Sequence, residues 1–81
     1  MNTEPMPSEA ATTVAKRATL APRLSQTLEA LLDGDSEKQV ALRLGISKHT
    51  VHVYVKLLYR RFGVCSRGEL MALVLKACLT S

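Results

Sequence analysis

From Leu20 to the C-terminus, hydrophobic residues recur at the spacing of amphipathic helices, and glycines separate the helical stretches. The first predicted helix covers about residues 22–33, because Pro22 suits a first helical position and a stripe of leucines follows it. After Gly34, Ser36 and Gln39 have the spacing of a capping box, which predicts a second helix that ends at Leu44.

The third predicted helix follows a connection of only three residues, Gly45, Ile46 and Ser47. Gly45 suits the left-handed end of one helix, and Ser47 can cap the next. A connection this short sets two helices at a steep angle, as in a helix-turn-helix. The third helix has one continuous inner line and ends at Gly63; the line consists of Val51, Val55, Leu58 and Phe62.

Ser66 and Glu69 have the spacing of a second capping box, which opens a fourth helix that runs to about Leu79. Strand-like alternation never persists, so the predicted fold class is all-α: a four-helix bundle with a helix-turn-helix and a long third helix. Residues 1–19 lack large aliphatic side chains other than Val14, which predicts a flexible, disordered tail before a domain over residues 20–81. A short helix over 9–18 would have little to bury.

The length of 81 residues allows one domain and leaves no room for a catalytic lobe, and 47% hydrophobic residues suit a folded chain. The sequence contains neither an apolar run long enough to span a membrane nor a secretory signal, which predicts a cytoplasmic protein without a membrane contact. If the chain is complete, its regulation must come from expression level, a partner or dimerisation.

Basic and acidic residues are segregated along the chain. From Lys38 onward, eight basic residues accompany one acidic residue, Glu69, whereas residues 20–37 contain one basic residue and four acidic ones. A basic C-terminal half attracts polyanions through their phosphates, although a solvated basic surface without a partner is the alternative.

The outer face of the third helix is basic and carries hydrogen-bond donors. With Val51 at 0° on a helical wheel, His52 lies at about 100°, Lys56 at 140°, His49 at 160°, Arg60 at 180° and Val53 at 200°. A helix of this size fits the major groove of B-form DNA. An outward Val53 suits contact with a thymine methyl group, although an isolated surface hydrophobe is equally common.

These residues resemble the helix-turn-helix domain of LuxR-type (GerE-like) bacterial transcription regulators. The resemblance covers Leu20 to about Leu75, and its most specific stretches are Leu44-Gly45-Ile46-Ser47, Thr50-Val51, Gly63-Val64 and Ser66-Arg67. It implies a four-helix domain whose third helix reads DNA and whose fourth helix commonly forms the dimer contact.

The resemblance implies roles for individual residues, position by position. Bases would be contacted by His52, Val53 and Lys56, and the wheel adds His49. Phosphates would be contacted by Lys38, Thr50, Tyr59, Arg61, Ser66 and Arg67, to which the helix start at Ser36 and the outward Arg60 are added.

The sequence departs from the family pattern at the start of the first helix. The family usually has Thr or Ser at the position of Ala21 and Glu at that of Leu24, which together form a capping box. Because both are absent here, we expect a weakly capped helix start. Tyr54 replaces a frequent His and is expected at the edge of the core.

The fourth predicted helix is apolar nearly all round, so its own core cannot cover every side. We expect the surplus face, Met71, Leu75, Cys78 and Leu79, to form a two-fold homodimer contact. The alternative is that this helix is more deeply buried in its own domain.

Other function classes find less support in the residues. His49 and His52 have no acidic or cysteine partner at ligand or triad spacing, and Cys65 and Cys78 lack the paired spacing of a metal site. The sequence therefore predicts no enzyme, no metal and no cofactor. The stronger alternative is a protein-interaction module that contacts RNA polymerase or another regulator and binds DNA weakly.

Overall fold

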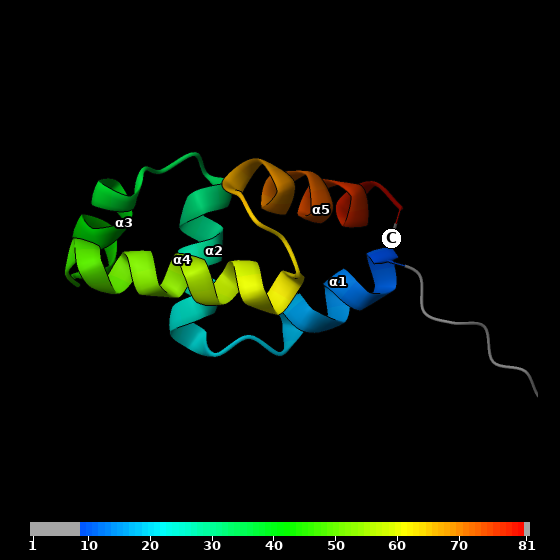
Figure 1. Cartoon of the computed structure of the whole chain (residues 1–81), viewed down its shortest axis with the longest axis horizontal. Coiled ribbons are helices and arrows are strands. Elements are labelled where there is room, and N and C mark those ends of the chain that lie inside the picture. The colour runs from blue at the N-terminus through cyan, green and yellow to red at the C-terminus, as the bar shows by residue number, and fades with distance from the viewer. Residues whose placement is uncertain (1–8, 81) are drawn as a thin grey trace, which may run out of the picture.

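The computed structural model describes residues 9–80, with only the backbone of Thr80, and within this range the chain is entirely helical, without a strand (Figure 1). The helices are α1 (Glu9–Ala18), α2 (Pro22–Leu32), α3 (Glu37–Leu44), α4 (Lys48–Phe62) and α5 (Arg67–Thr80). The predicted all-α class is confirmed, and the four expected helices, now α2 to α5, are all present.

The capping signals in the sequence define the ends of α3 and α4. The amide of Gln39 donates to Ser36 Oγ at 3.2 Å, and the amide of Ser36 donates to Gln39 Oε1 at 2.8 Å, so the predicted capping box is complete. The amide of Thr50 donates to Ser47 Oγ at 3.0 Å. Gly45 ends α3 with a φ of 67°, a left-handed conformation that glycine adopts without a Cβ clash.

The start of α5 is only half as predicted. The amide of Glu69 donates to Ser66 Oγ at 3.2 Å, as expected, but Glu69 Oε2 accepts from the amide of Cys65 at 2.7 Å. The carboxylate therefore reaches one residue further back than the capping box requires. It still satisfies a backbone donor and places negative charge in the first turn, where the helix dipole favours it.

The core forms where α2, α3, α4 and α5 meet. The inner line of α4, Val51, Val55, Leu58 and Phe62, is buried as predicted. It packs against buried residues of α2, α3 and α5, namely Leu28, Ala30, Leu31, Val40, Ala41, Leu70 and Val74. This packing holds α4 by one face, while α3 lies across its N-terminal end (Figure 1).

The predicted tail is wrong for residues 9–18, which form α1; residues 1–8 lie outside the described part of the chain. The broadest contact of α1 is with α5, and Thr13 is the buried residue of α1. The Thr13 hydroxyl donates to the Glu9 carbonyl at 2.9 Å, so burial leaves it without an unsatisfied donor. An ion pair of 2.8 Å between Arg17 and Glu29 ties α1 to α2.

The start of α2 lacks a side-chain cap, because Ala21 occupies the N-cap position. We expect Ala21→Thr to stabilise the domain by about 1 kcal/mol, since a threonine hydroxyl can accept from a first-turn amide. For a domain of this size the melting temperature should rise by roughly 4–8 °C in a calorimetric scan. Ala21→Val, which has a similar shape without the hydroxyl, serves as the control; an equal rise in both variants would contradict the capping explanation.

Candidate nucleic-acid interface

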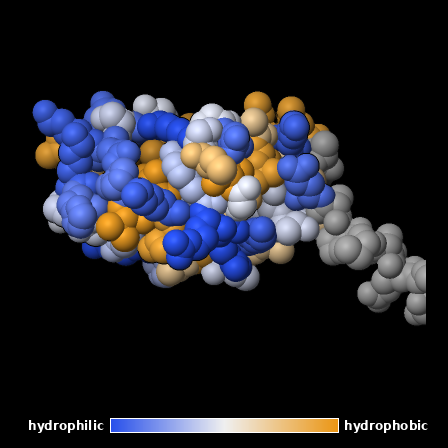
Figure 2. All heavy atoms as spheres, viewed as in Figure 1, coloured by the Kyte–Doolittle hydropathy of each residue, from blue (hydrophilic) through white to orange (hydrophobic). Residues whose placement is uncertain are grey.

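The outer face of α4 collects the four residues predicted to contact bases. His49, His52, Val53 and Lys56 are all exposed, and Val53 retains 41% of its accessible surface. They lie opposite the buried line of α4, so the core fixes the direction in which they project. Figure 2 shows hydrophilic surface, in blue, over α3 and again near the C-terminal end of α4, with hydrophobic patches, in orange, between the two.

Two predicted phosphate contacts on one flank of α4, Tyr59 and Arg67, lie against neighbouring helices. Arg67 is half-buried, and its Nη2 donates to the Leu31 carbonyl at 3.0 Å, which satisfies an acceptor at the C-terminal end of α2. Tyr59 is half-buried as well. Burial raises the pKa of its phenol, the carboxylate of Glu37 raises it further, and Arg67 opposes both effects. Tyr59 therefore stays a neutral hydroxyl that can donate to a phosphate.

The other flank of α4 carries Arg61, whose position depends on α1. Arg61 Nη2 donates to Thr19 Oγ1 at 2.9 Å. The Thr19 hydroxyl in turn lies 3.0 Å from the Ala15 carbonyl and 3.2 Å from the Lys16 carbonyl at the end of α1. Arg60 is exposed on the outer face, and its side chain has no hydrogen bond or ion pair among the described residues.

The remaining predicted phosphate contacts lie at helix starts. Ser36, Ser47 and Ser66 open α3, α4 and α5, and Lys38 is exposed in the first turn of α3. Thr50 is half-buried, with its hydroxyl 2.8 Å from Ser47 Oγ. First-turn amides and the positive end of the helix dipole favour anions at such places.

One contact was missed by sequence reasoning: His52 Nδ1 lies 3.3 Å from Glu37 Oε1. Glu37 is the first residue of α3, fifteen positions before His52, and nothing in the local pattern pairs them. The steep α3–α4 turn brings them together. A carboxylate therefore lies at the edge of an otherwise basic face.

The other acidic side chains near α3 are paired away from α4. Arg43 contacts Asp33 at 3.0 Å and Asp35 at 2.8 Å. Its hydrogen bonds to Asp33 and Asp35 raise the pKa of Arg43, so the guanidinium remains charged. By contrast, His49, Lys56 and Arg60 have no acidic partner within the described part of the chain.

The outer side of α5 carries the residues predicted for the dimer contact. Leu75, Cys78 and Leu79 are exposed, with 59% for Leu75 and 76% for Leu79, whereas Met71 is half-buried against the core. Met71, Leu75 and Cys78 line one groove of about 390 Å³, together with Leu32 and Arg17. The structure thus brings three of the four predicted residues into one apolar groove.

Comparison with family models identifies a match between residues 18–74 and the bacterial regulatory proteins of the luxR family, GerE. The chain belongs to this family. The match runs from the last residue of α1 through α2, α3 and α4 to Val74 in α5, so the α3–α4 unit is the helix-turn-helix of a LuxR-family domain. No curated protein and no solved structure matches the chain.

Family membership gives a DNA-binding transcription regulator, in a family that is not one of enzymes. No cluster of three or more potential metal ligands occurs in the described residues. Nor does any helix within 9–80 have the length and apolarity needed to cross a membrane. Most of α1 and the end of α5 lie outside the family match, so their roles must be argued from this chain itself.

Proposed function

We propose that this LuxR-family chain regulates transcription in the cytoplasm by binding duplex DNA in a sequence-specific manner, as a homodimer, with α4 in the major groove. One observation carries the proposal. The buried line of α4 is fixed in the core, while the opposite line presents four donor or apolar side chains to solvent, three of them without an acidic partner in the described chain. A braced helix with such a face suits direct base readout.

The chemistry of the four side chains suggests their roles. Lys56 can donate to guanine O6 or N7, and the imidazoles of His49 and His52 can donate to base acceptors or phosphates. Val53, although apolar, is 41% exposed on α4, which suits contact with a thymine methyl group. The same face of α4 therefore offers hydrogen-bond donors and one apolar contact.

Phosphate contacts on both sides of α4 would fix its register in the groove. The proposed set is Ser36, Lys38, Thr50, Tyr59, Arg60, Arg61, Ser66 and Arg67. Of these, Arg61 and Arg67 each donate one hydrogen bond within the chain, and a guanidinium has further donors for a phosphate. The internal bonds would hold the two guanidinium groups in place for the ligand.

The apolar groove on α5 supports homodimerisation. A two-fold axis through Met71, Leu75 and Cys78 would pair the groove with its own copy and cover Leu75. Two α4 helices could then enter successive major grooves about 34 Å apart. A palindromic operator is the expected ligand.

Selection of bound sequences from a random duplex pool tests the proposal. We expect enrichment of two half-sites about one helical turn apart. Adding the selected duplex should shift the amide resonances of His52, Val53 and Lys56. No enrichment, or shifts that leave these three residues unchanged, would overturn it.

A protein-interaction module that contacts RNA polymerase is the alternative function. The two candidate functions predict different salt dependence of DNA binding, because each phosphate contact contributes about 0.9 to the slope of log affinity against log salt concentration. Specific DNA binding through this basic face should weaken steeply with salt. A weak, salt-insensitive DNA affinity beside tight binding to polymerase would favour the alternative.

The Glu37–His52 contact gives a prediction for affinity. Glu37→Gln removes a carboxylate that lies 3.3 Å from His52 at the edge of the outer face of α4. Because this carboxylate would repel the DNA phosphates, we expect DNA affinity to rise about threefold to tenfold. Titration at fixed salt measures the change. Asp33→Asn, which loses the same charge while Arg43 keeps its 2.8 Å ion pair with Asp35, is the matched control. An equal rise in the two variants would show that net charge alone acts.

A further inference from the structure

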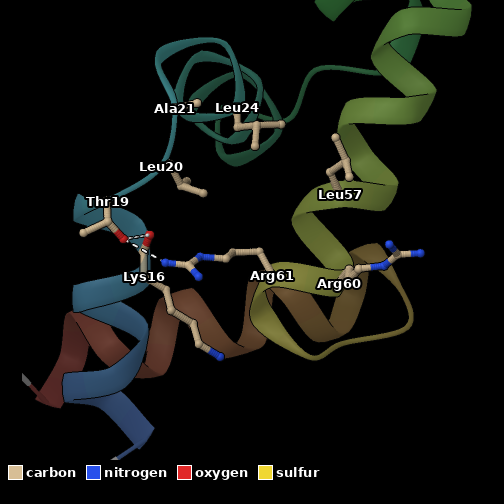
Figure 3. Close-up of a pocket in the computed structure, with 8 residues that line it drawn as sticks. All are labelled: Lys16, Thr19, Leu20, Ala21, Leu24, Leu57, Arg60 and Arg61. Atoms are coloured by element: carbon tan, nitrogen blue, oxygen red, sulfur yellow. Dashed lines mark hydrogen bonds between the residues drawn. The ribbon is translucent and has the colours of Figure 1, made fainter.

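A groove between α1, α2 and α4 brings together two cationic side chains, Lys16 and Arg61, near the C-terminal end of α4 (Figure 3). It has a volume of about 570 Å³ and is lined by Leu20, Leu24 and Leu57, with Lys16, Arg60 and Arg61 around it. Figure 3 shows Arg61 reaching across to Thr19, Lys16 beside it, and Arg60 projecting to the other side of α4. Arg60 and Arg61 belong to the proposed phosphate set, whereas Lys16 comes from α1, outside the family match.

No acidic residue offsets this cluster. None lines the groove, and Lys16 has no ion pair within residues 9–80. Glu29, the acidic residue that pairs with α1, is taken by Arg17 at 2.8 Å. The like charges of Lys16 and Arg61 at one groove repel each other, and an anion between them would offset this repulsion (Figure 3).

The position of Lys16 is fixed by the fold. Its neighbour Arg17 is anchored on α2, and the end of α1 is tied to α4 through the 2.9 Å hydrogen bond between Arg61 and Thr19. Thr13, one turn earlier, is buried against the rest of the domain. The backbone at Lys16 is therefore already in place, so binding an anion beside α4 would require ordering of the Lys16 side chain alone, which limits the entropic cost.

A helix in the major groove is bordered by two phosphate strands, and the two flanks of α4 differ. On the flank of α4 that carries Tyr59, the nearby cation is Arg67 of α5, which lies within the family match. On the flank that carries Arg61, the nearby cation is Lys16 of α1. We propose that Lys16, with Arg61, binds the DNA phosphate strand on this flank, so that α1 extends the DNA-binding surface beyond the LuxR-family domain. The groove leucines would meet the sugars between phosphates.

This inference rests on the proposed DNA binding, and one experiment separates the two. The affinity of the selected duplex is measured against salt concentration for the wild type, Lys16→Gln, Lys16→Arg and Lys76→Gln. Lys76→Gln removes the same charge from an exposed position on α5. Circular dichroism verifies that all four chains have the same helix content.

We expect Lys16→Gln to lower the salt slope by about 0.9 and the affinity at 0.1 M salt by about eightfold, while Lys16→Arg and Lys76→Gln retain the wild-type slope. If the wild type binds and Lys16→Gln has its slope unchanged, the role of Lys16 is wrong and the proposed function stands. If the wild type itself binds no duplex, the proposed function fails.

Discussion

Lys56→Glu is expected to lower the affinity for the selected duplex by about 100-fold. Roughly half of this loss, on a logarithmic scale, comes from the missing ammonium donor, and the rest comes from a carboxylate held against the anionic groove. Lys56 is exposed on the outer face of α4 and has no ion pair in the described chain, so its replacement should leave the fold intact. Fluorescence titration with labelled duplex measures the change.

Lys76→Glu is the control for Lys56→Glu, because it alters the net charge equally at an exposed position on α5. Only the general electrostatic attraction should fall in this variant, by a few-fold at moderate salt. Similar affinities for the two variants would mean that the outer face of α4 does not lie in the major groove of the DNA. The thermal transition of both chains should remain that of the wild type.

Leu75→Glu is expected to convert the proposed dimer to a monomer and to weaken binding to a palindromic duplex by at least about 100-fold. Leu75 is 59% exposed in the single chain, so a carboxylate there is hydrated in the monomer. In a two-fold interface it would be buried against its own copy without a partner. The bivalent advantage would then be lost, while affinity for a single half-site should stay within about threefold of wild type.

Sedimentation equilibrium measures the first part of this prediction, and Leu42→Glu supplies a matched control. Leu42 is 76% exposed on α3, outside the α5 groove, so the same substitution there should leave the dimer intact. A wild-type chain that stays monomeric at high concentration, free and on the palindromic duplex, would contradict the interface. So would a Leu75→Glu chain that remains dimeric.

Much of the fold can be predicted from the sequence, because helix caps and helical periodicity depend on residues that are close together in the chain. Gly45 and Gly63 end helices with the same φ of 67°, and the serines before α3, α4 and α5 cap them as their spacing predicts. The outward direction of His52 and Lys56 follows from helical periodicity once the opposite line is apolar.

The missed features depend on residues distant along the chain. The helix α1 is poor in large aliphatic side chains, and its stability depends on α5, some sixty positions later. The Glu37–His52 contact and the Arg61–Thr19 hydrogen bond both join different elements across fifteen and forty-two positions. No pattern of spacing within one helix contains that information.

The sequence by itself determined four helices, the tight turn between α3 and α4, and the face of α4 that stays outside the core, because propensity, capping and periodicity act over a few residues. Only the tertiary structure decided that residues 9–18 are helical against α5 and that Lys16 lies beside Arg61. The reason is that a short segment with few aliphatic side chains becomes helical only when a packing partner is available, and the position of that partner is set by the whole fold.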